Sequence, residues 1–402
     1  MKYIVMLGDG MADFPVAELG NKTPLEVANK PYMDFLAKNG TVGMAKTVPD
    51  GMSPGSDVAN LSVMGYDPEQ CYTGRSPLEA VSIGIDLDDT DVTFRCNLVT
   101  LSDAKDLADA DMIDYSAGEI STPEATEIVN FLDSHFRTEN IRLYAGTSYR
   151  HCLVLKGAKT GAKLTPPHDI SKKPVKDHLP KGENAELLFD LMLRSRELLA
   201  DHPVNKARIA AGKNPVTCCW FWGEGTKPAV SDFFEKYGLH GGVISAVDLI
   251  KGIGICAGHK VALVDNVTGN WDTNFKGKAN AALDLLENGC DYVYIHVEGP
   301  DECGHHGDLE HKISSIESID KEILGTIIPA LQQKNEPFSI LLMPDHPTPL
   351  SIMTHVSDPV PFVIYNSEKK GNGAPAYTEE NAKQTGLYVE KACDLLNKML
   401  NY

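Results

Sequence analysis

The sequence CDYVYIHVEGPDECGHHGD, residues 290–308, joins an apolar run to a stretch that is crowded with carboxylates and imidazoles. The apolar half, residues 290–297, is short and continuous, as expected of a strand buried on both faces of a parallel sheet. The other half places Asp301 and the adjacent histidines His305 and His306 directly after that strand. Such a stretch is either a solvated acidic loop or a metal site, and the rest of the chain decides between them.

The chain on either side of the middle region alternates short apolar runs with helical patterns. Apolar runs predict strands at residues 2–7, 260–265, 338–347 and 359–366, and helical spacing predicts helices at residues 23–40, 278–289, 311–333 and 385–400. Alternating strands and helices predict an α/β domain with a parallel sheet flanked by helices.

The middle of the chain has a different pattern. Residues 91–101 alternate like a strand, residues 141–157 have the pattern of a hairpin, and residues 185–202 have that of a long amphipathic helix. These features predict that an α+β domain is inserted into the α/β domain. The predicted boundaries give a discontinuous α/β domain, residues 1–88 and 236–402, and an inserted domain, residues 89–235.

The composition excludes several classes of partner. A net charge of −19 argues against a general affinity for nucleic acid or for anionic membranes. No apolar run approaches the roughly 18 residues of a membrane span, and the N-terminus turns polar too early for a signal peptide. The nine cysteines show no CxxC spacing, which is typical of reduced thiols in the cytoplasm. We therefore expect a cytoplasmic protein that acts on a small metabolite; a homo-oligomer is compatible with the sequence, which leaves the oligomeric state open.

Residues that can bind metals cluster at the ends of the predicted strands. They are Asp9 after residues 2–7, Asp301 and His305 after residues 290–297, Asp345 and His346 within residues 338–347, and His355 before residues 359–366. Ligands of open parallel sheets bind outside the carboxyl ends of the strands, so these residues can converge. Three carboxylates and three imidazoles suit two sites for Mn²⁺ or Zn²⁺ and, less well, Mg²⁺. Two close cations can clamp the attacking and leaving oxygens of a phosphoryl transfer.

Each of these residues alone has a simpler explanation. An Asp at a strand end is more often a turn residue or a helix cap, and His355 alone could be a core histidine. Ser56 follows Pro54 and Gly55 and opens a predicted helix, so it is either an N-cap or a nucleophile. The joint pattern favours metal sites, with His306 left outside them because a DxxxH loop needs only one histidine.

With these motifs the chain resembles the archaeal-type branch of the cofactor-independent phosphoglycerate mutases, in the alkaline phosphatase superfamily. The motifs, in family order, are MLGDGMAD, PGSDVANLSVMGYDP, YTGRSPLEA, FRCNLVT, YRHCLVL, KPVKDHLP, HPVNKARIAAGKNP, DECGHHGD, MPDHPTP and SDPVPF, and they lie between residues 4 and 366. The resemblance implies an alkaline-phosphatase-like sheet with an inserted domain. It also implies the glycolytic interconversion of 3-phosphoglycerate and 2-phosphoglycerate, with two divalent metal ions and without 2,3-bisphosphoglycerate.

The same resemblance implies roles for individual residues. One cation would be held by Asp9, Ser56, Asp345 and His346, and the other by Asp301, His305 and His355. Ser56 would be phosphorylated transiently. The inserted domain would close over the substrate with basic side chains, among which Arg150 is the best candidate and Lys176 and Arg208 are weaker ones.

Two positions depart from the branch. Its members tend to have an Arg-rich segment where this chain has DYSAGEIS, residues 114–121, and a Lys near the position of Glu298. Glu119 and Glu298 therefore replace basic residues, and a carboxylate next to the carboxylate of phosphoglycerate is unfavourable. Because a substrate ammonium would suit such a site, the alternative function is phosphoryl transfer to an amino-acid hydroxyl, as in a homoserine kinase. A third alternative is a non-catalytic, metal-stabilised binding protein, against which the intact Ser56 argues.

Overall fold

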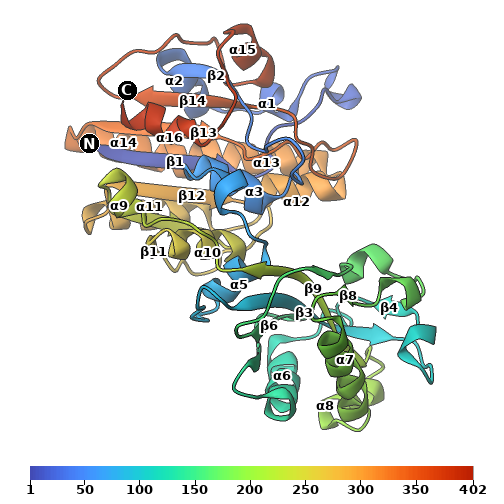
Figure 1. Cartoon of the computed structure of the whole chain (residues 1–402). Coiled ribbons are helices and arrows are strands. Elements are labelled where there is room, and N and C mark those ends of the chain that lie inside the picture. The colour runs from blue at the N-terminus through green and yellow to red at the C-terminus, as the bar shows by residue number, and fades with distance from the viewer. Residues whose placement is uncertain (402) are drawn as a thin grey trace. The chain divides into compact units, whose positions relative to one another are not determined.

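The computed structural model describes residues 1–401, which divide into two units (Figure 1). The first unit contains Met1–Tyr72 and the chain from Ala229 onward, and the second contains Thr73–Pro228. The second unit therefore begins and ends earlier in the chain than the inserted domain that the sequence predicted, residues 89–235.

The earlier start of the second unit has a packing reason. Helix α5 (Ser76–Ser82) contacts the strands of the second unit, and Ala80 lies in a hydrophobic cluster with Cys152 and Val154 of that unit. Ile85 belongs to the same cluster. Residues 73–88 thus contribute to the core of the insert, although they contain no strand that would have marked them as part of it.

The first unit is built on an eight-stranded sheet with the order β11-β10-β12-β1-β13-β14-β2-β15. Its strands are β1 (Lys2–Gly8), β2 (Thr41–Ala45), β10 (Gly241–Ile244), β11 (Lys260–Val261), β12 (Tyr292–Val297), β13 (Phe338–Met343), β14 (Val360–Asn366) and β15 (Tyr388–Val389). The strands from β11 to β13 are parallel, as predicted. Strand β14 is antiparallel to β13 and β2, which corrects the prediction of a wholly parallel sheet. The connection between β13 and β14, residues 344–359, is fully described and contains no helix, so β14 returns beside β13 as in a hairpin.

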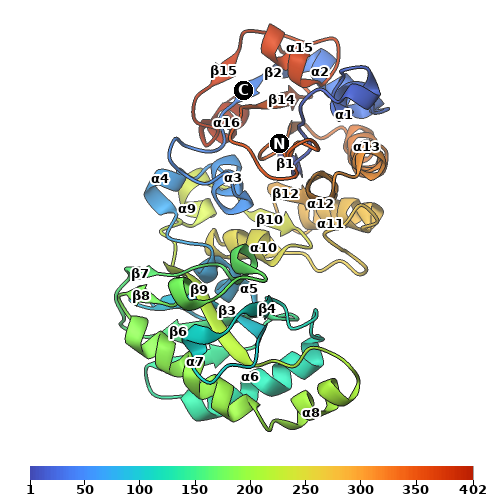
Figure 2. The ribbon, with the colours of Figure 1, turned by 90° about the vertical axis from the view of Figure 1, so that its right-hand side faces the viewer.

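Helices cover both faces of this sheet (Figure 2). The helices of the first unit are α1 (Pro24–Val27), α2 (Pro31–Asn39), α3 (Ser56–Val63), α4 (Pro68–Cys71), α9 (Phe233–Tyr237), α10 (Asp248–Cys256), α11 (Phe275–Glu287), α12 (Gly299–His306), α13 (Leu309–Ser318), α14 (Gly325–Lys334), α15 (Glu379–Gln384) and α16 (Asp394–Leu400). Apolar residues of α2, α11, α13 and α14 form one core with β1, β12 and β13, whereas α3, α10 and α16 lie on the other face. The predicted helix 311–333 is α13, the π-helical turn η5 (Ile319–Leu324) and α14 in succession.

The second unit has a five-stranded antiparallel sheet of its own. Its strands are β3 (Val92–Leu101), β4 (Met112–Asp114), β5 (Ile141–Tyr144), β6 (Arg150–Leu155) and β9 (Cys218–Thr226), with β3 between β6 and β9. Its longer helices are α6 (Thr122–Phe136), α7 (Ala185–Leu199) and α8 (Pro203–Ala210). Helices α6 and α7 supply apolar residues to the core beneath this sheet, so the unit is α+β, as predicted. Within residues 1–401, no helix is both long and apolar enough to cross a bilayer.

A buried ion pair ties two ligand-bearing loops of the first unit to helix α13. Lys312 of α13 is fully buried, and its Nζ lies 2.7 Å from Asp13 Oδ2 and 2.8 Å from the carbonyl oxygen of Thr348. Asp13 lies in the loop after β1, and Thr348 lies in the connection after β13. Lys312 thus bonds to both loops and anchors them to α13.

We expect Lys312→Met to lower the free energy of unfolding by about 3–5 kcal/mol, because it leaves the Asp13 carboxylate buried without its cation. The measurement is urea unfolding followed by a signal from the first unit. The matched control is Lys251→Met, which breaks a half-exposed pair with Asp248 on α10 and should cost less than about 1 kcal/mol. Equal losses in both variants would contradict the role of the buried pair.

Candidate active site

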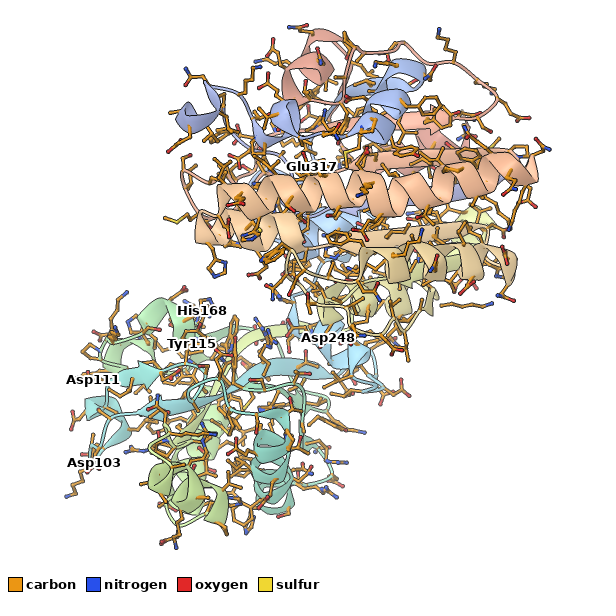
Figure 3. All side chains as sticks on the ribbon, turned by 180° about the vertical axis from the view of Figure 1, so that it is seen from behind. Asp103, Asp111, Tyr115, His168, Asp248 and Glu317 are labelled. Carbon is orange, nitrogen blue, oxygen red and sulfur yellow. The ribbon has the colours of Figure 1, made fainter. Side chains whose placement is uncertain are left out.

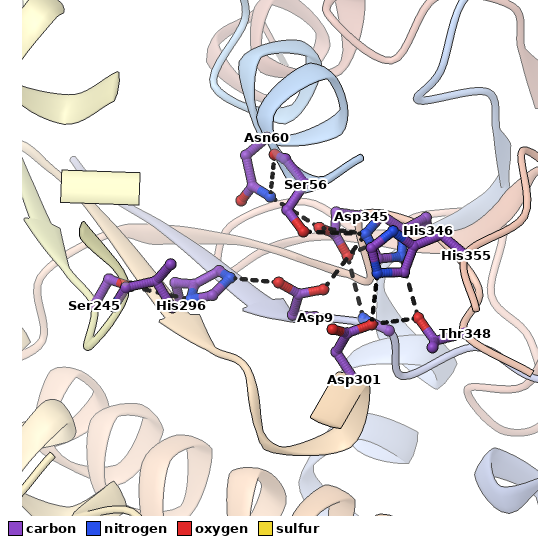
Figure 4. A network of polar contacts seen from close by, with 12 residues as sticks. Asp9, Ser56, Asn60, Ser245, His296, Asp301, Asp345, His346, Thr348 and His355 are labelled. Carbon is purple, nitrogen blue, oxygen red and sulfur yellow. Dashed lines mark hydrogen bonds and ion pairs between the residues drawn. The ribbon is translucent and has the colours of Figure 1, made fainter. Parts of the chain in front are cut away.

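Three neighbouring parallel strands bring the candidate ligands to one edge of the sheet. Strand β1 lies between β12 and β13, with Gly8 opposite Val297 and Leu7 opposite Met343. The strands therefore end at the same level, and the residues that follow them meet (Figure 4). These residues are Asp9 after β1, Asp301 and His305 on α12, and Asp345, His346 and His355 after β13.

The first group of ligand atoms comes from Asp9, Asp345 and His346. Their ligand atoms lie within 4.8 Å of one another, and all three residues are buried. Nε2 of His346 lies 3.6 Å from Asp9 Oδ1 and 3.4 Å from Asp345 Oδ2. Two carboxylate oxygens and one imidazole nitrogen suit a divalent cation such as Mn²⁺ or Zn²⁺.

The second group comes from Asp301, His346 and His355. Nε2 of His355 lies 3.3 Å from Asp301 Oδ1, and the ring of His355 stacks on that of His346 at 4.0 Å. Nε2 of His305 lies 3.3 Å from Asp301 Oδ2 and 2.8 Å from Nε2 of His355. The geometry thus brings together every residue of the two predicted sets. It also makes His346 a member of both groups, which the sequence did not predict.

The charges of these groups fit a cation. In residues 1–401, Asp9 Oδ1 is buried and has no hydrogen-bond partner. Burial, followed by the charges of Asp345, Asp301 and Glu298, raises the pKa of Asp9 well above its usual range. A bound divalent cation would supply the missing partner of Oδ1 and would stabilise the ionised carboxylate. The donors present therefore fit metal ions.

Polar neighbours fix the orientation of the ligands. Thr348 donates its hydroxyl hydrogen to Asp301 Oδ1, and Thr348 Oγ1 itself lies 3.3 Å from His346 Nδ1. Asn60 Nδ2 donates to Asp345 Oδ2 at 2.8 Å. These contacts leave Nε2 of His346 directed at the first group, because a neutral imidazole that donates from Nδ1 has its lone pair on Nε2.

Ser56 is the first residue of α3, and its hydroxyl faces the first group. Ser56 Oγ lies 3.2 Å from His346 Nε2. The side chain makes no capping hydrogen bond at the start of the helix, where Gly55 is the N-cap, so it is not the simple cap that the sequence allowed. Asn60, one turn further along α3, accepts a hydrogen bond from Tyr294 at 2.6 Å and donates to the carbonyl of Ser56 at 2.9 Å. The start of α3 is thus held beside the ligands.

The second unit contains a basic cluster, which we call the arginine group: Arg75, Glu79, Arg95, Arg150 and Trp222. Nε of Arg75 and Nε of Arg95 each lie 2.8 Å from an oxygen of Glu79. The guanidinium of Arg95 lies 4.1 Å from the centre of the Trp222 ring. Burial lowers the pKa of Arg95 to about 10 against the attraction of Glu79, and the charges of Arg75 and Arg150 lower it further. Two guanidinium groups thus pair with one carboxylate and that of Arg150 acts on it through its charge, which leaves an excess of positive charge.

Aromatic side chains extend the arginine group. His168 lies edge-on to Trp222 at 5.2 Å and to Tyr115 at 6.2 Å (Figure 3). The guanidinium of Arg150 lies 5.2 Å from the ring of Tyr149, which meets Tyr115 at 5.8 Å. Arg150 is exposed, so the guanidinium that the sequence favoured is accessible.

The other predicted basic residues of the insert have different surroundings. Arg208 is buried, pairs with Glu124 at 2.8 Å, and donates to the carbonyl oxygens of Asn214 and Ala117. Its guanidinium is therefore committed inside the unit, and the expectation that it faces a substrate does not fit this geometry. Lys176 is exposed at the start of the short helical turn η4 (Lys176–His178), away from any contact that would assign it a role.

The two acidic departures also have distinct surroundings. Glu119 is exposed in a turn with φ of +50°. Burial raises the pKa of the Tyr149 phenol, and the charge of Glu119 adds to this effect. Glu298 is partly buried at the N-cap of α12. Burial lowers the pKa of Lys278 to about 8, and the charge of Glu298 opposes this effect. Lys278, fully buried on α11, thus gives Glu298 a positive neighbour within the same unit.

Known proteins share this chain's sequence and fold. The family model for 2,3-bisphosphoglycerate-independent phosphoglycerate mutase matches residues 37–205. A probable mutase of that name from Geobacter sulfurreducens is 50% identical over 402 residues and is covered completely, as is this chain. A mutase of that name from Methanothrix thermoacetophila is 49% identical over 400 residues, with 100% of both chains covered.

Solved structures share the fold of this chain. A protein of Pyrococcus horikoshii has 29% identity and a TM-score of 0.83, with 100% of this chain and 96% of that chain covered. A cofactor-independent phosphoglycerate mutase from Thermoplasma acidophilum has the same fold, with a TM-score of 0.69 at 24% identity and coverage of 100% and 99%. With full-length relatives near half identity, the chain belongs to the 2,3-bisphosphoglycerate-independent phosphoglycerate mutase family.

Proposed function

We propose that this chain is a metal-dependent phosphoglycerate mutase that interconverts 3-phosphoglycerate and 2-phosphoglycerate through a phosphoserine at Ser56. The observation that carries the proposal is the distance of 3.2 Å between Ser56 Oγ and Nε2 of His346, the imidazole common to both cation groups. A hydroxyl nucleophile beside two cation sites suits phosphoryl transfer through a serine. The full-length relatives that carry the mutase name support this choice of substrate.

The residues of the site form two cation sites in the proposed reaction. Asp9, Asp345 and His346, with Ser56, hold one divalent cation; Asp301, His305 and His355, with His346 nearby, hold the other. Mn²⁺ and Zn²⁺ suit these donors better than Mg²⁺ does. When bound, the cations neutralise phosphate oxygens and lower the pKa of the serine hydroxyl. The N-terminus of α3 adds backbone N–H groups that favour a phosphate at Ser56.

Atoms and protons balance over two transfers. Ser56 Oγ loses its proton and bonds to phosphorus, the ester bond to the 3-oxygen of glycerate breaks, and that oxygen gains a proton. In the second transfer the 2-hydroxyl of glycerate loses its proton and bonds to the phosphorus, the bond between phosphorus and Ser56 Oγ breaks, and Oγ regains a proton. Water must stay out in between, because it would hydrolyse the phosphoserine and make the protein a phosphatase.

The arginine group supports an anionic substrate. A protein with a net charge of −19 concentrates three guanidinium groups around Glu79 in the second unit. Phosphoglycerate carries a carboxylate besides its phosphate, and planar guanidinium groups bind carboxylates in a bidentate manner. We assign the substrate carboxylate to Arg95, Arg75 and Arg150.

The alternative of phosphoryl transfer to an amino-acid hydroxyl loses its main argument. It depended on a Glu298 carboxylate that would attract a substrate ammonium. The ammonium of Lys278 already acts on Glu298 inside the unit. The nine cysteines are all free, which supports the further proposal that the protein works in the reducing cytoplasm.

We expect the purified protein to convert 3-phosphoglycerate to 2-phosphoglycerate when Mn²⁺ is present. The measurement is ³¹P NMR of the two esters, because a coupled enolase would itself respond to a chelator. Chelation should abolish turnover and added Mn²⁺ should restore it, since the proposed transfer depends on the cation groups. Turnover that survives complete chelation would contradict the proposal, as would an inactive protein with two ions bound.

Ser56→Ala should lower kcat by about 10³-fold or more, because it removes the nucleophile. The matched control is Ser62→Ala on the same helix, a buried serine whose hydroxyl donates to the carbonyl of Thr47 at 2.6 Å. Ser62→Ala should keep turnover within a few-fold. Mass spectrometry of the peptide with Ser56 after acid quenching should find phosphoserine in the unchanged protein. Full turnover of Ser56→Ala would rule out the phosphoserine route.

Arg95→Gln should raise KM for 3-phosphoglycerate by about 10- to 100-fold, the value of a charge-assisted hydrogen bond of 1.5–3 kcal/mol. The control is Arg142→Gln, which removes another guanidinium of the same unit that pairs with an acid, Asp133, and lies 5.0 Å from an aromatic ring. The control should leave KM unchanged. Equal KM values in both variants would remove the arginine group from the substrate site.

A further inference from the structure

His296 is a buried histidine that the proposed reaction does not use. It lies on β12, opposite Leu7 of β1, and it is fully buried. Nε2 of His296 lies 2.8 Å from Asp9 Oδ2, and Nδ1 lies 3.1 Å from Ser245 Oγ (Figure 4). Both ring nitrogens therefore have a protein partner, so neither has a lone pair to offer a cation.

The hydrogen bonds that link Ser245, His296 and Asp9 all donate in the same direction, toward Asp9. The backbone N–H of Val247 donates to Ser245 Oγ at 2.9 Å, so the hydroxyl hydrogen of Ser245 is available for His296 Nδ1. An Nδ1 that accepts this hydrogen bond belongs to a neutral imidazole with its hydrogen on Nε2. Nε2 then donates to Asp9 Oδ2, which is a carboxylate oxygen and can only accept.

This series of hydrogen bonds ends at Asp9 Oδ2 and leaves the other carboxylate oxygen, Oδ1, for the cation. Because His296 engages Oδ2, the rotation of the Asp9 carboxylate is fixed, and Oδ1 remains without a hydrogen bond in residues 1–401. Oδ1 is also the oxygen that lies 3.6 Å from Nε2 of His346. A buried lysine also fixes the backbone of His296, because Lys278 Nζ donates to the carbonyl oxygen of His296 at 2.8 Å.

We propose that His296, set by Ser245, is a positioning residue that presents Asp9 Oδ1 to the cation of the first group and is not itself a ligand. The inference rests on the cation site of the proposed function. It assigns a role to a residue outside both ligand groups, and it predicts that the donor on His296, rather than its imidazole lone pair, is what the metal site requires.

The test compares three variants of the full chain by Mn²⁺ binding, read from the EPR signal of free Mn²⁺ during titration. His296→Leu removes the donor and should weaken one of two Mn²⁺ sites by about 10- to 100-fold. His296→Gln keeps an amide N–H donor and should bind within a few-fold of the unchanged protein. Ser245→Ala removes the hydroxyl that fixes the tautomer of His296, so it should weaken the same site by several-fold.

The matched control is His259→Leu in the same unit. His259 is buried against Phe233 at 4.7 Å, and neither of its ring nitrogens has a hydrogen-bond partner in the described chain. It should change Tm without changing Mn²⁺ affinity, which separates loss of a buried imidazole from loss of the donor.

The outcomes are distinguishable. Unchanged Mn²⁺ affinity in His296→Leu, or in Ser245→Ala if the first variant fails to fold, overturns the inference alone. A loss in His296→Gln as large as that in His296→Leu also overturns it, because it makes the imidazole a ligand. An unchanged protein that binds no Mn²⁺ overturns the inference together with the metal sites, whereas tight Mn²⁺ binding without mutase turnover contradicts the proposed function only.

Discussion

The mutual repulsion of buried carboxylates is the constraint on which the site of the first unit depends. Asp9, Asp301 and Asp345 are all buried at the ends of three adjacent strands. Two like charges 4 Å apart cost about 4 kcal/mol at an effective dielectric constant of about 20. The protein's own groups relieve part of this cost: hydrogen bonds from His305 and His355 hold the pKa of Asp301 well below its usual range although burial opposes them. Asp9 has no such relief at Oδ1, and a cation is the partner that its position requires.

The fold holds the candidate ligands rigidly in place despite this repulsion. Gly10 approaches Asp301 so closely that a Cβ would lie 2.6 Å from its Cα, and its φ of +60° also favours glycine. Lys312 binds the loop after β1 and the connection after β13 to α13. Thr348 and His296 then fix individual ligand atoms. Asp301 and His305 lie on α12, and these contacts anchor the loops that carry the other ligands, which keeps the donors within the tolerance that a metal site needs.

Sequence reasoning selected the residues that converge at the two cation groups because strand ends are local signals: an apolar run followed by Asp is visible without tertiary information. It could not find that His346 serves both groups, since that depends on the stacking of His346 on His355. His296 was hidden because a strand buried on both faces shows no alternation that would mark a polar residue as misplaced. Asn60 and Thr348 act through contacts across more than 40 residues of chain, to Asp345 and Asp301. The expected role of Arg208 at the substrate does not fit the structure, because its guanidinium is buried against Glu124, which lies 84 residues away in the chain and which no local pattern reveals.

The surroundings of Glu298 in space, and not its position in the sequence, also decide what effect this residue has on a substrate. Compared position by position, the chain has an acid where the family tends to have a base, which on its own suggests a different substrate. Compared in space, the acid at position 298 faces the buried ammonium of Lys278 on another helix, so the local charge is closer to neutral than the sequence suggests. The energy of a substrate anion depends on the sum of nearby charges and not on the residue at one aligned position. Specificity in this family is therefore better inferred from the summed charge around a site than from a single substitution.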